Sequence, residues 1–396
     1  NMEWGYGDAD VSIFNPDTLA CEQWVKVLKD GGMKGVIFTA KHHDGFCLWP
    51  SKFTDYSIKY SPYRQGKGDA VGELQAAIRK LGGIKLGIYL SPWDRHQASY
   101  GTQDYVTYYY NQLEELMTRY GDIFEVWFDG ANGGDGWYGG ACEKREIDRS
   151  TYYNYPKAWT IVNRLQPDAV IFSDGGPGCR WVGNEKGFAN ATNWAFLRSK
   201  EVYPGYPQYE ELQSGHADGD AWCASECDTS IRPGWFYHKS EDGKVKTPEQ
   251  LFDLYCKSVG RNATFLLNVP VNRDGLISRQ DITSLQGYKA LLTATFDGTH
   301  HPFRQEGDYY YAAVPEGEWK GVILAEDISR GQRVKAFTIE YQNANGQWKA
   351  IPADEAMTTI GHKRIIRLSS PAEATMLRLR ITDSRADAII KAFECF

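Results

Sequence analysis

The 396-residue sequence has no run of about 18 consecutive apolar residues, which a membrane-spanning helix would need. It also has no cluster of Lys and Arg side chains, and its formal net charge is −7. A protein that binds the phosphate backbone of a nucleic acid usually presents a basic surface. No signal peptide is recognisable at Asn1. The sequence therefore predicts a globular protein that neither crosses a membrane nor binds nucleic acid.

Paired cysteines at metal-binding spacing are also missing. The eight cysteines are scattered, and although Cys223 and Cys227 lie four residues apart, no second pair or histidine follows at zinc spacing. We therefore expect free or buried thiols, no metal site and no cofactor.

Aromatic residues, in contrast, are abundant, at 14% of the chain, with 13 Trp and 25 Tyr. These two side chains combine an apolar ring with a polar tip, so they can stack on the apolar face of a sugar ring and still reach its hydroxyl groups. The composition therefore favours a carbohydrate ligand.

Helical and strand patterns alternate along most of the chain. Amphipathic helices are predicted over residues 18–32, 70–83, 105–122, 152–168 and 248–262. Each is followed by a short apolar strand, at residues 35–40, 84–90, 124–129, 169–174 and 263–270. This alternation is typical of parallel βα units, in a barrel or in a doubly wound sheet. No GxGxxG follows the first strand, which disfavours a dinucleotide-binding fold.

The pattern changes after about residue 285. Short alternating stretches at residues 333–342, 364–369 and 375–382 are separated by polar turns and have no helical period between them. Such stretches are typical of an antiparallel β-sandwich. We therefore expect a β/α domain over residues 1–285 and an all-β domain over residues 286–396.

Polar and aromatic residues follow the predicted strands. KHHDGFCLWP, SPWDRH, DGANGG and DGGPGCRWVGNE each begin where a strand ends. In a βα barrel, these segments would meet at the C-terminal face, where active sites lie. Asp129, in FEVWFDGAN, fits either a turn that leaves the strand or a working carboxylate.

Several of these motifs together resemble one known family. KHHDGF, WFDG, RWVGNE, SIRPGWFYH and LLNVPVNRDGL look like the motifs of glycoside hydrolase family 29, the retaining α-L-fucosidases, and they span residues 36 to 277. The segment GQRVKAFTIE resembles the discoidin-like sandwich often appended in this family. The resemblance implies a (β/α)8-like barrel, irregular or incomplete because the chain begins without the family's first, His-Phe-Gly-type strand, followed by a carbohydrate-binding-like β-sandwich.

The resemblance also implies catalytic roles. The aspartate of the WFDG motif is the nucleophile, which is Asp129 here, and the glutamate of the GNE triplet is the acid/base, which is Glu185 here. Glu226, in WCASECDTSIRPGW, is the alternative acid/base. For a retaining mechanism the two carboxyl groups are expected about 5–5.5 Å apart.

Substrate-binding side chains are expected in the same motifs and near the N-terminus. They are His42, His43, Trp49, Trp127, Trp235 and Glu3. In this comparison the ring of Trp235 packs against the C5 methyl group of fucose.

The implied activity is hydrolysis of α-1,3- or α-1,4-linked L-fucose from branched, Lewis-type oligosaccharides or glycoconjugates. Two alternatives stay open: an α-L-fucosidase of broad specificity that includes α-1,2 and α-1,6 linkages, and a non-catalytic fucose-binding protein. Because fucosylated glycans are extracellular, we expect a periplasmic or secreted location. Two glycosylation triplets begin at Asn190 and Asn262, and Asn262 lies against a predicted buried strand.

Overall fold

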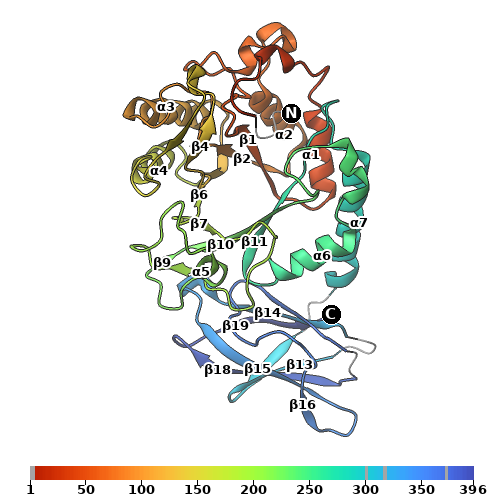
Figure 1. Cartoon of the computed structure of the whole chain (residues 1–396). Coiled ribbons are helices and arrows are strands. Elements are labelled where there is room, and N and C mark those ends of the chain that lie inside the picture. Colours follow the sequence, from red (N-terminus) through yellow and green to blue (C-terminus); the bar gives the residue numbers. More distant parts are fainter. Residues whose placement is uncertain (1–4, 299–301, 315–318, 371–372) are drawn as a thin grey trace.

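The N-terminal part of the protein is built on a parallel sheet of seven strands, which curls into a half-barrel (Figure 1). The computed structural model describes residues 5–298, 302–314, 319–370 and 373–396. In spatial order the strands are β1 (Gly35–Lys41), β2 (Lys85–Leu90), β3 (Ile123–Trp127), β6 (Val170–Ser173), β7 (Cys179–Trp181), β10 (Ala224–Ser230) and β11 (Ala263–Asn268). All neighbouring pairs run parallel, which confirms the predicted fold class.

Helices cover the outside of this sheet (Figure 1). They are α1 (Cys21–Asp30), α2 (Ala70–Leu81), α3 (Gln103–Arg119), α4 (Tyr155–Leu165), α5 (Tyr209–Ser214), α6 (Pro248–Lys257) and α7 (Arg279–Phe296). Local sequence fixes several of their starts. The Asp69 side chain accepts a hydrogen bond from the Gly72 N–H at the start of α2, and Thr247 and Gln250 form a capping box at the start of α6.

Strands β1 and β11 are the two edges of the sheet, and within the described residues no ladder joins them. Helices α1 and α7 pack against each other beside these edges. The Trp24 indole donates a hydrogen bond to the Gly275 carbonyl at 2.7 Å, and the Gln23 side chain bonds both to the carbonyl and to the N–H of Ile277. The contacts of α1 with α7 and with the segment before α7 therefore hold the two ends of the half-barrel together.

Strand β10, with the sequence ASECDTS, is the least expected element of the sheet. Its residues are polar, yet every one after Ala224 is buried. Hydrogen bonds from neighbouring side chains satisfy its inward-facing carboxylates, as described below. Sequence periodicity missed this strand because a predicted buried strand is normally apolar.

The C-terminal part consists of two antiparallel sheets. The first contains β12 (Phe303–Glu306), β13 (Tyr309–Ala313), β18 (Met376–Ser384), β15 (Val334–Gln342) and β16 (Trp348–Ala350), and the second contains β17 (Arg364–Arg367), β14 (Gly321–Glu326) and β19 (Ile390–Cys395). Buried side chains from both sheets form one apolar cluster. The predicted domain boundary at residue 285 falls inside α7, which runs on to Phe296. We therefore propose that the division between the two parts lies after this helix.

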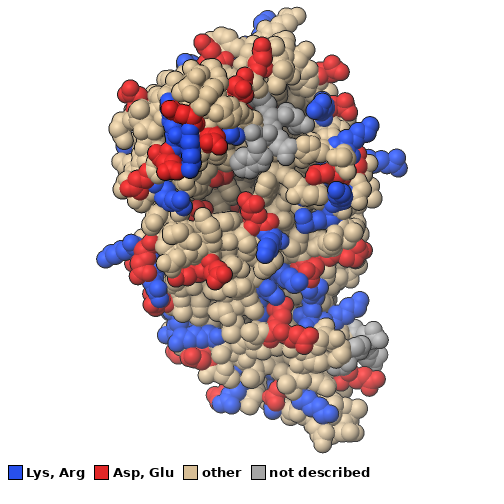
Figure 2. All heavy atoms as spheres, in the orientation of Figure 1, with Lys and Arg blue, Asp and Glu red and all other residues tan. Residues whose placement is uncertain are grey.

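Two small antiparallel sheets of two strands each lie on the loops of the half-barrel. They are β4 (Gly133–Gly136) with β5 (Glu143–Glu146), and β8 (Phe196–Leu197) with β9 (Ala221–Trp222). Figure 2 shows acidic and basic side chains interspersed over the face it draws. Among the helices that the structure describes, none has the length and apolar character needed to cross a bilayer.

Buried polar contacts join the two parts of the chain. The carboxamide of Gln332, which is 1% exposed, accepts hydrogen bonds from the Ala195 N–H at 2.7 Å and from the Asn262 side chain at 3.2 Å. Its nitrogen donates to the Asn193 carbonyl at 2.9 Å. A residue just before β15 thus satisfies backbone groups of the barrel loops.

Replacing Gln332 with Ala should lower the free energy of unfolding by about 1–3 kcal/mol, because the buried Ala195 N–H and Asn193 carbonyl lose their partner. Urea unfolding of both proteins measures the difference. Gln347, in an exposed turn, is the matched control, and Gln347→Ala should change stability by less than about 0.5 kcal/mol. Equal losses in the two variants would contradict the role of Gln332.

Candidate functional site

Asp129 follows strand β3 at the C-terminal mouth of the half-barrel, and 27% of its side chain is exposed. The Tyr89 hydroxyl donates a hydrogen bond to its Oδ2 at 2.8 Å, and the Ala131 N–H donates to its Oδ1 at 2.8 Å. These two donors fix the orientation of a carboxylate that solvent or a ligand can still reach. A Cβ atom at Gly130 would collide with the Asp174 side chain, so the turn after Asp129 requires glycine.

His42 and His43 stand beside Asp129, and the Nε2 atom of His43 is 3.9 Å from its Oδ2. Burial lowers the pKa of each imidazole to about 3, so both rings are neutral near pH 7. His43 Nδ1 lies 2.6 Å from the Ser91 hydroxyl, which itself donates to the Trp93 carbonyl at 2.7 Å. This network assigns the proton to Nδ1 and leaves Nε2 as an acceptor on the side of Asp129. Such an acceptor suits a ligand hydroxyl group.

A buried ion pair holds together the loops that follow β1 and β2. Lys41 Nζ lies 3.0 Å from Asp94 Oδ2 and 2.9 Å from the Gln112 carboxamide oxygen. The other oxygen of Asp94 accepts the N–H groups of His96 and Gln97. The two sequence motifs KHHDGF and SPWDRH therefore form one fixed unit at the mouth.

Glu185 lies in the loop after β7, a strand that is three positions away from β2 in the order of the sheet. The residue is exposed as a whole, yet partial burial of its carboxyl group, followed by the negative charge of Asp129, raises its pKa. A hydrogen bond with the Trp235 side chain works in the opposite direction. The structure thus brings three predicted residues, Asp129, Glu185 and Trp235, to one mouth.

Asp228, on β10, was not predicted. It is 5% exposed and accepts a hydrogen bond from the Trp181 indole at 2.8 Å. Burial raises its pKa well above the ordinary carboxyl range, and the charge of Glu185 adds to that effect. Asp228 therefore anchors the first aromatic residue of the RWVGNE motif below Glu185.

Glu226 is 4% exposed, and both of its oxygens accept hydrogen bonds inside the barrel. The Trp127 indole donates to Oε1 at 2.8 Å, and the Thr264 hydroxyl donates to Oε2 at 3.0 Å. The carboxyl group of Glu125 hydrogen-bonds to the same residue. Together with Cys179, these carboxyls place one potential metal ligand each within 4.8 Å of one another.

The other predicted binding residues have different surroundings. Trp127 is half-buried and stacks on Phe172, with ring centroids 4.0 Å apart. Trp49 is fully buried in the apolar core and donates to Glu115 at 3.1 Å, so the structure does not bring it to the mouth. Glu3 lies outside the described residues. Phe236 was missed, although its ring packs edge-on against His42, because an aromatic residue in a loop is usually read as packing.

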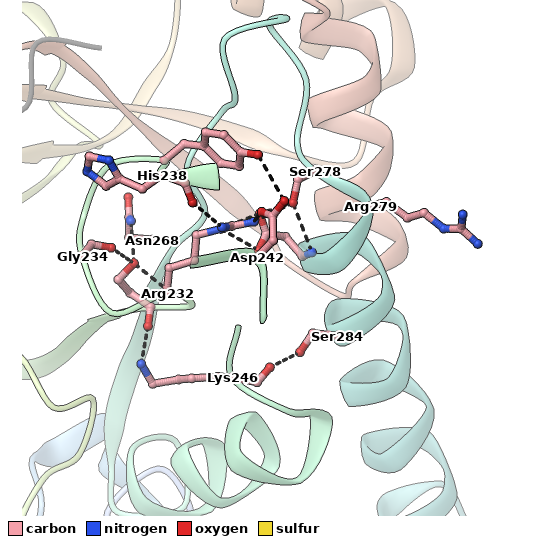
Figure 3. A network of polar contacts seen from close by, with 12 residues as sticks. Arg232, Gly234, His238, Asp242, Lys246, Asn268, Ser278, Arg279 and Ser284 are labelled. Carbon is pink, nitrogen blue, oxygen red and sulfur yellow. Dashed lines mark hydrogen bonds and ion pairs between the residues drawn. The ribbon is translucent and has the colours of Figure 1, made fainter. Parts of the chain in front are cut away.

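A buried guanidinium network holds the loop that carries Trp235 and Phe236 (Figure 3). Arg232 Nε lies 3.0 Å from Asp281 Oδ1, both side chains are fully buried, and a second carboxylate, Asp242, lies 3.0 Å from its Nη2. Arg232 also donates to the Ser278 hydroxyl and to the His238 carbonyl. Figure 3 shows these groups converging from the loop and from the start of α7.

Asn268, at the end of β11, completes this support. Its side-chain nitrogen donates to the Trp235 carbonyl at 2.8 Å and to the Ser230 hydroxyl at 2.9 Å. The position of the Trp235 ring therefore depends on strand β11 and on α7.

A cavity of about 330 Å³ adjoins the loop after Asp129. It is lined by Asn132, Gly133, Gly134, Lys144, Glu146, Ile147 and Arg149, mostly from the β4–β5 hairpin. Its volume is at the lower end of the range of small-molecule sites.

Comparisons with known proteins agree over nearly the whole chain. Residues 1–294 match the family model described as alpha-L-fucosidase. Alpha-L-fucosidase 1 of Arabidopsis thaliana is 40% identical over 427 residues, which cover 98% of this chain and 81% of that protein.

Two solved structures extend the similarity to three dimensions. A glycoside hydrolase 29 family member from an unknown rumen bacterium is 45% identical, with a TM-score of 0.94, and the match covers 100% of this chain and 72% of the other. A glycoside hydrolase 29 fucosidase of Ruminococcus gnavus in complex with fucose is 28% identical, with a TM-score of 0.84, and the match covers 99% and 88% of the two chains.

Replacing Asp281 with Ala should lower the free energy of unfolding by about 3–5 kcal/mol, because it takes one carboxylate from a fully buried guanidinium. Chemical denaturation measures the loss. Asp30→Ala is the control, because its pair with Lys26 is exposed and should contribute no more than about 0.5 kcal/mol. If Asp281→Ala were as stable as the control, Arg232 would not be the anchor of this loop.

Proposed function

The chain belongs to the alpha-L-fucosidase family, glycoside hydrolase family 29, and from this premise we propose that it releases α-1,3- or α-1,4-linked L-fucose from branched glycans by a retaining mechanism. The protein is a glycoside hydrolase. Asp129 acts as the nucleophile and Glu185 as the acid/base. The observation that carries this assignment is the effect of the Asp129 charge on the pKa of Glu185, because such an effect requires the two carboxyls to lie near each other at the mouth.

The reaction takes two displacements. First, the Asp129 carboxylate attacks the anomeric carbon of fucose while Glu185 gives its proton to the glycosidic oxygen, and the bond to the leaving sugar breaks. Then the ionised Glu185 takes a proton from a water molecule, whose oxygen attacks the same carbon, and the bond to Asp129 breaks. The product has the configuration of the substrate.

The charge of Asp129 fits both steps. While Asp129 is ionised, it raises the pKa of Glu185 and favours the protonated acid that the first step needs. Once Asp129 is bonded to the sugar, its charge is gone and the pKa of Glu185 falls. Glu185 can then act as the base that the second step requires.

Neighbouring side chains bind the fucose in this proposal. The neutral His43 ring accepts a hydrogen bond from a sugar hydroxyl group at Nε2, and His42 lies beside it. The Trp235 ring, fixed by Asn268 and by its bond to Glu185, packs against the C5 methyl group. Trp127 forms part of the floor. The substrates are fucosylated oligosaccharides or glycoconjugates, and because these are displayed outside cells we place the enzyme in the periplasm or the secreted fraction.

Removing either carboxyl should strongly reduce turnover of a Lewis trisaccharide. We expect a loss on the order of 10⁴-fold for Asp129→Ala and about 10²–10⁴-fold for Glu185→Ala. With an activated aryl fucoside and azide, Glu185→Ala should give a fucosyl azide of retained configuration, and Asp129→Ala one of inverted configuration. NMR spectra of the products distinguish them.

The pH profile gives a second readout of the same variants. Glu185 must be protonated to act as acid, so kcat/KM of the wild type should hold at pH values below its raised pKa and fall above it. Glu185→Ala should lack this alkaline limb with the aryl fucoside. Retention of the limb, or an azide product of inverted configuration, would rule out Glu185 as the acid/base.

Linkage preference is tested by comparing substrates. We expect kcat/KM for a Lewis trisaccharide to exceed that for an α-1,2-linked fucosyl-lactose by at least about tenfold, a difference of about 1.4 kcal/mol in the barrier. Fucose release measured by a coupled assay gives both values. Equal values would favour the broad-specificity alternative, whereas binding of fucose without any release would favour the non-catalytic one.

A further inference from the structure

Glu125 and Glu226 form a carboxyl pair inside the barrel that the reaction above does not use. Glu125 lies on β3 and Glu226 on β10, and the two side chains are hydrogen-bonded to each other. Two carboxyl groups can share a hydrogen bond only when a proton lies between them. Burial, followed by the charge of Glu226, raises the pKa of Glu125 well above its ordinary range. Burial raises the pKa of Glu226 as well, and the hydrogen bond between the two groups has Glu125 as its donor.

Glu226 also holds an aromatic ring. The Trp127 indole donates to Glu226 Oε1 at 2.8 Å, while Thr264 occupies Oε2. Because Glu226 is buried and both of its oxygens accept hydrogen bonds, the geometry of its bond to the indole is well defined. Glu226 thus fixes the tilt and depth of the Trp127 ring.

Trp127 is the centre of a row of stacked rings across the sheet. Its ring lies between those of Phe172, at 4.0 Å, and Tyr89, at 5.4 Å, and the His42 ring follows Tyr89 at 5.9 Å. The strand register places these residues side by side, with Trp127 opposite both Tyr89 and Phe172. A shift of the central ring therefore moves its neighbours.

One ring of this row contacts the nucleophile. The Tyr89 hydroxyl donates to Asp129 Oδ2 at 2.8 Å, so the position of the Tyr89 ring decides where this oxygen points. A continuous set of contacts runs from Glu226 through Trp127 and Tyr89 to Asp129. Misplacing a reacting group by about 1 Å can reduce a rate by about 10²-fold.

The same contacts disfavour Glu226 as the acid/base. It is 4% exposed, both of its oxygens are occupied, and it bonds to Glu125 and Trp127, which precede Asp129 on the strand. A proton donor to the glycosidic oxygen has to reach the mouth.

We propose that Glu226 is a positioning residue for the first displacement, acting through the Trp127 indole and the Tyr89 hydroxyl on the Asp129 carboxylate. Glu125 supplies the proton that lets two carboxyls share this site. The inference rests on the proposed role of Asp129 as nucleophile.

Variants of Glu226 separate the two roles. Gln keeps an acceptor for the Trp127 indole but cannot act as an acid, so Glu226→Gln should stay within about tenfold of wild-type kcat/KM, and Glu226→Ala should lose about 10²-fold. Both losses should be the same for an activated aryl fucoside and for a Lewis trisaccharide, and azide should restore neither. Tyr89→Phe combined with Glu226→Ala should lose less than the product of the single effects, because both act on one contact.

Glu326→Ala is the matched control. Glu326 is 2% exposed in the antiparallel sheets, where it accepts three backbone N–H groups, so its loss should reduce stability and leave kcat/KM unchanged. The role of Glu226 is overturned if Glu226→Ala keeps wild-type activity. It is equally overturned if Glu226→Gln loses as much as Glu226→Ala on the trisaccharide while aryl fucoside hydrolysis is spared.

Affinity for L-fucose, measured by calorimetry, tests the inference even if the wild type releases no fucose, an outcome that would contradict the proposed function alone. The Ala variant should bind fucose at least about fivefold more weakly, because Tyr89 and Asp129 are displaced, and the Gln variant should bind it like the wild type. Equal affinity in all three proteins would overturn the positioning role.

Discussion

Successive side chains of a β-strand point to opposite faces of the sheet, and this alternation sets the arrangement of the whole site. Along β3 it gives Glu125, Trp127 and Asp129 one common side, the interior of the half-barrel. The three residues then have different surroundings at different depths: a shared proton for Glu125, a stacked ring for Trp127 and a partly exposed mouth for Asp129. The inward-facing side chains of the neighbouring strands therefore have to fit an acid at Glu125, a ring at Trp127 and a second acid at Asp129.

The barrel interior therefore contains carboxyl groups where most barrels contain aliphatic side chains. Such groups are costly to bury unless each has a partner. Here indole N–H groups donate hydrogen bonds to two of these carboxyl groups, Glu226 and Asp228, and a lysine ammonium group donates one to a third, Asp94. The large number of Trp and Tyr residues is thus explained in part by the acids they satisfy, in addition to any sugar they contact. Likewise, the buried guanidinium group of Arg232 forms an ion pair with the buried carboxylate of Asp281 at the edge of the sheet.

Much of this could be predicted from the sequence. The helices and the apolar strands have clear periods, and the motif containing Asp129 stands at the end of one of these strands. Strand β10 could not be predicted from its period, because its buried residues are polar and gain their stability from partners far away in the sequence. The domain boundary expected at residue 285 falls inside helix α7. The residues after the first turns of this helix have no strong apolar stripe from which its full length could be predicted. Trp49 and Trp127 look alike in sequence, and only the partners of their indole groups, Glu115 and Glu226, separate a residue of the apolar core from one on the inner face of the sheet.

The contact between Asn262 and Gln332 has a consequence for how the protein is produced. Asn262 begins a glycosylation triplet, yet its side-chain nitrogen donates to Gln332 and its oxygen accepts the His362 N–H, so the folded protein has no room for a glycan there. In a host that attaches glycans to the nascent chain, modification of Asn262 would come before the antiparallel sheets have formed. The attached sugar would then prevent Gln332 from forming its hydrogen bonds between the two parts of the chain. A bacterial host avoids this competition between the oligosaccharyl transferase and folding, whereas replacement of Thr264 would also remove the hydrogen bond that its hydroxyl donates to Glu226.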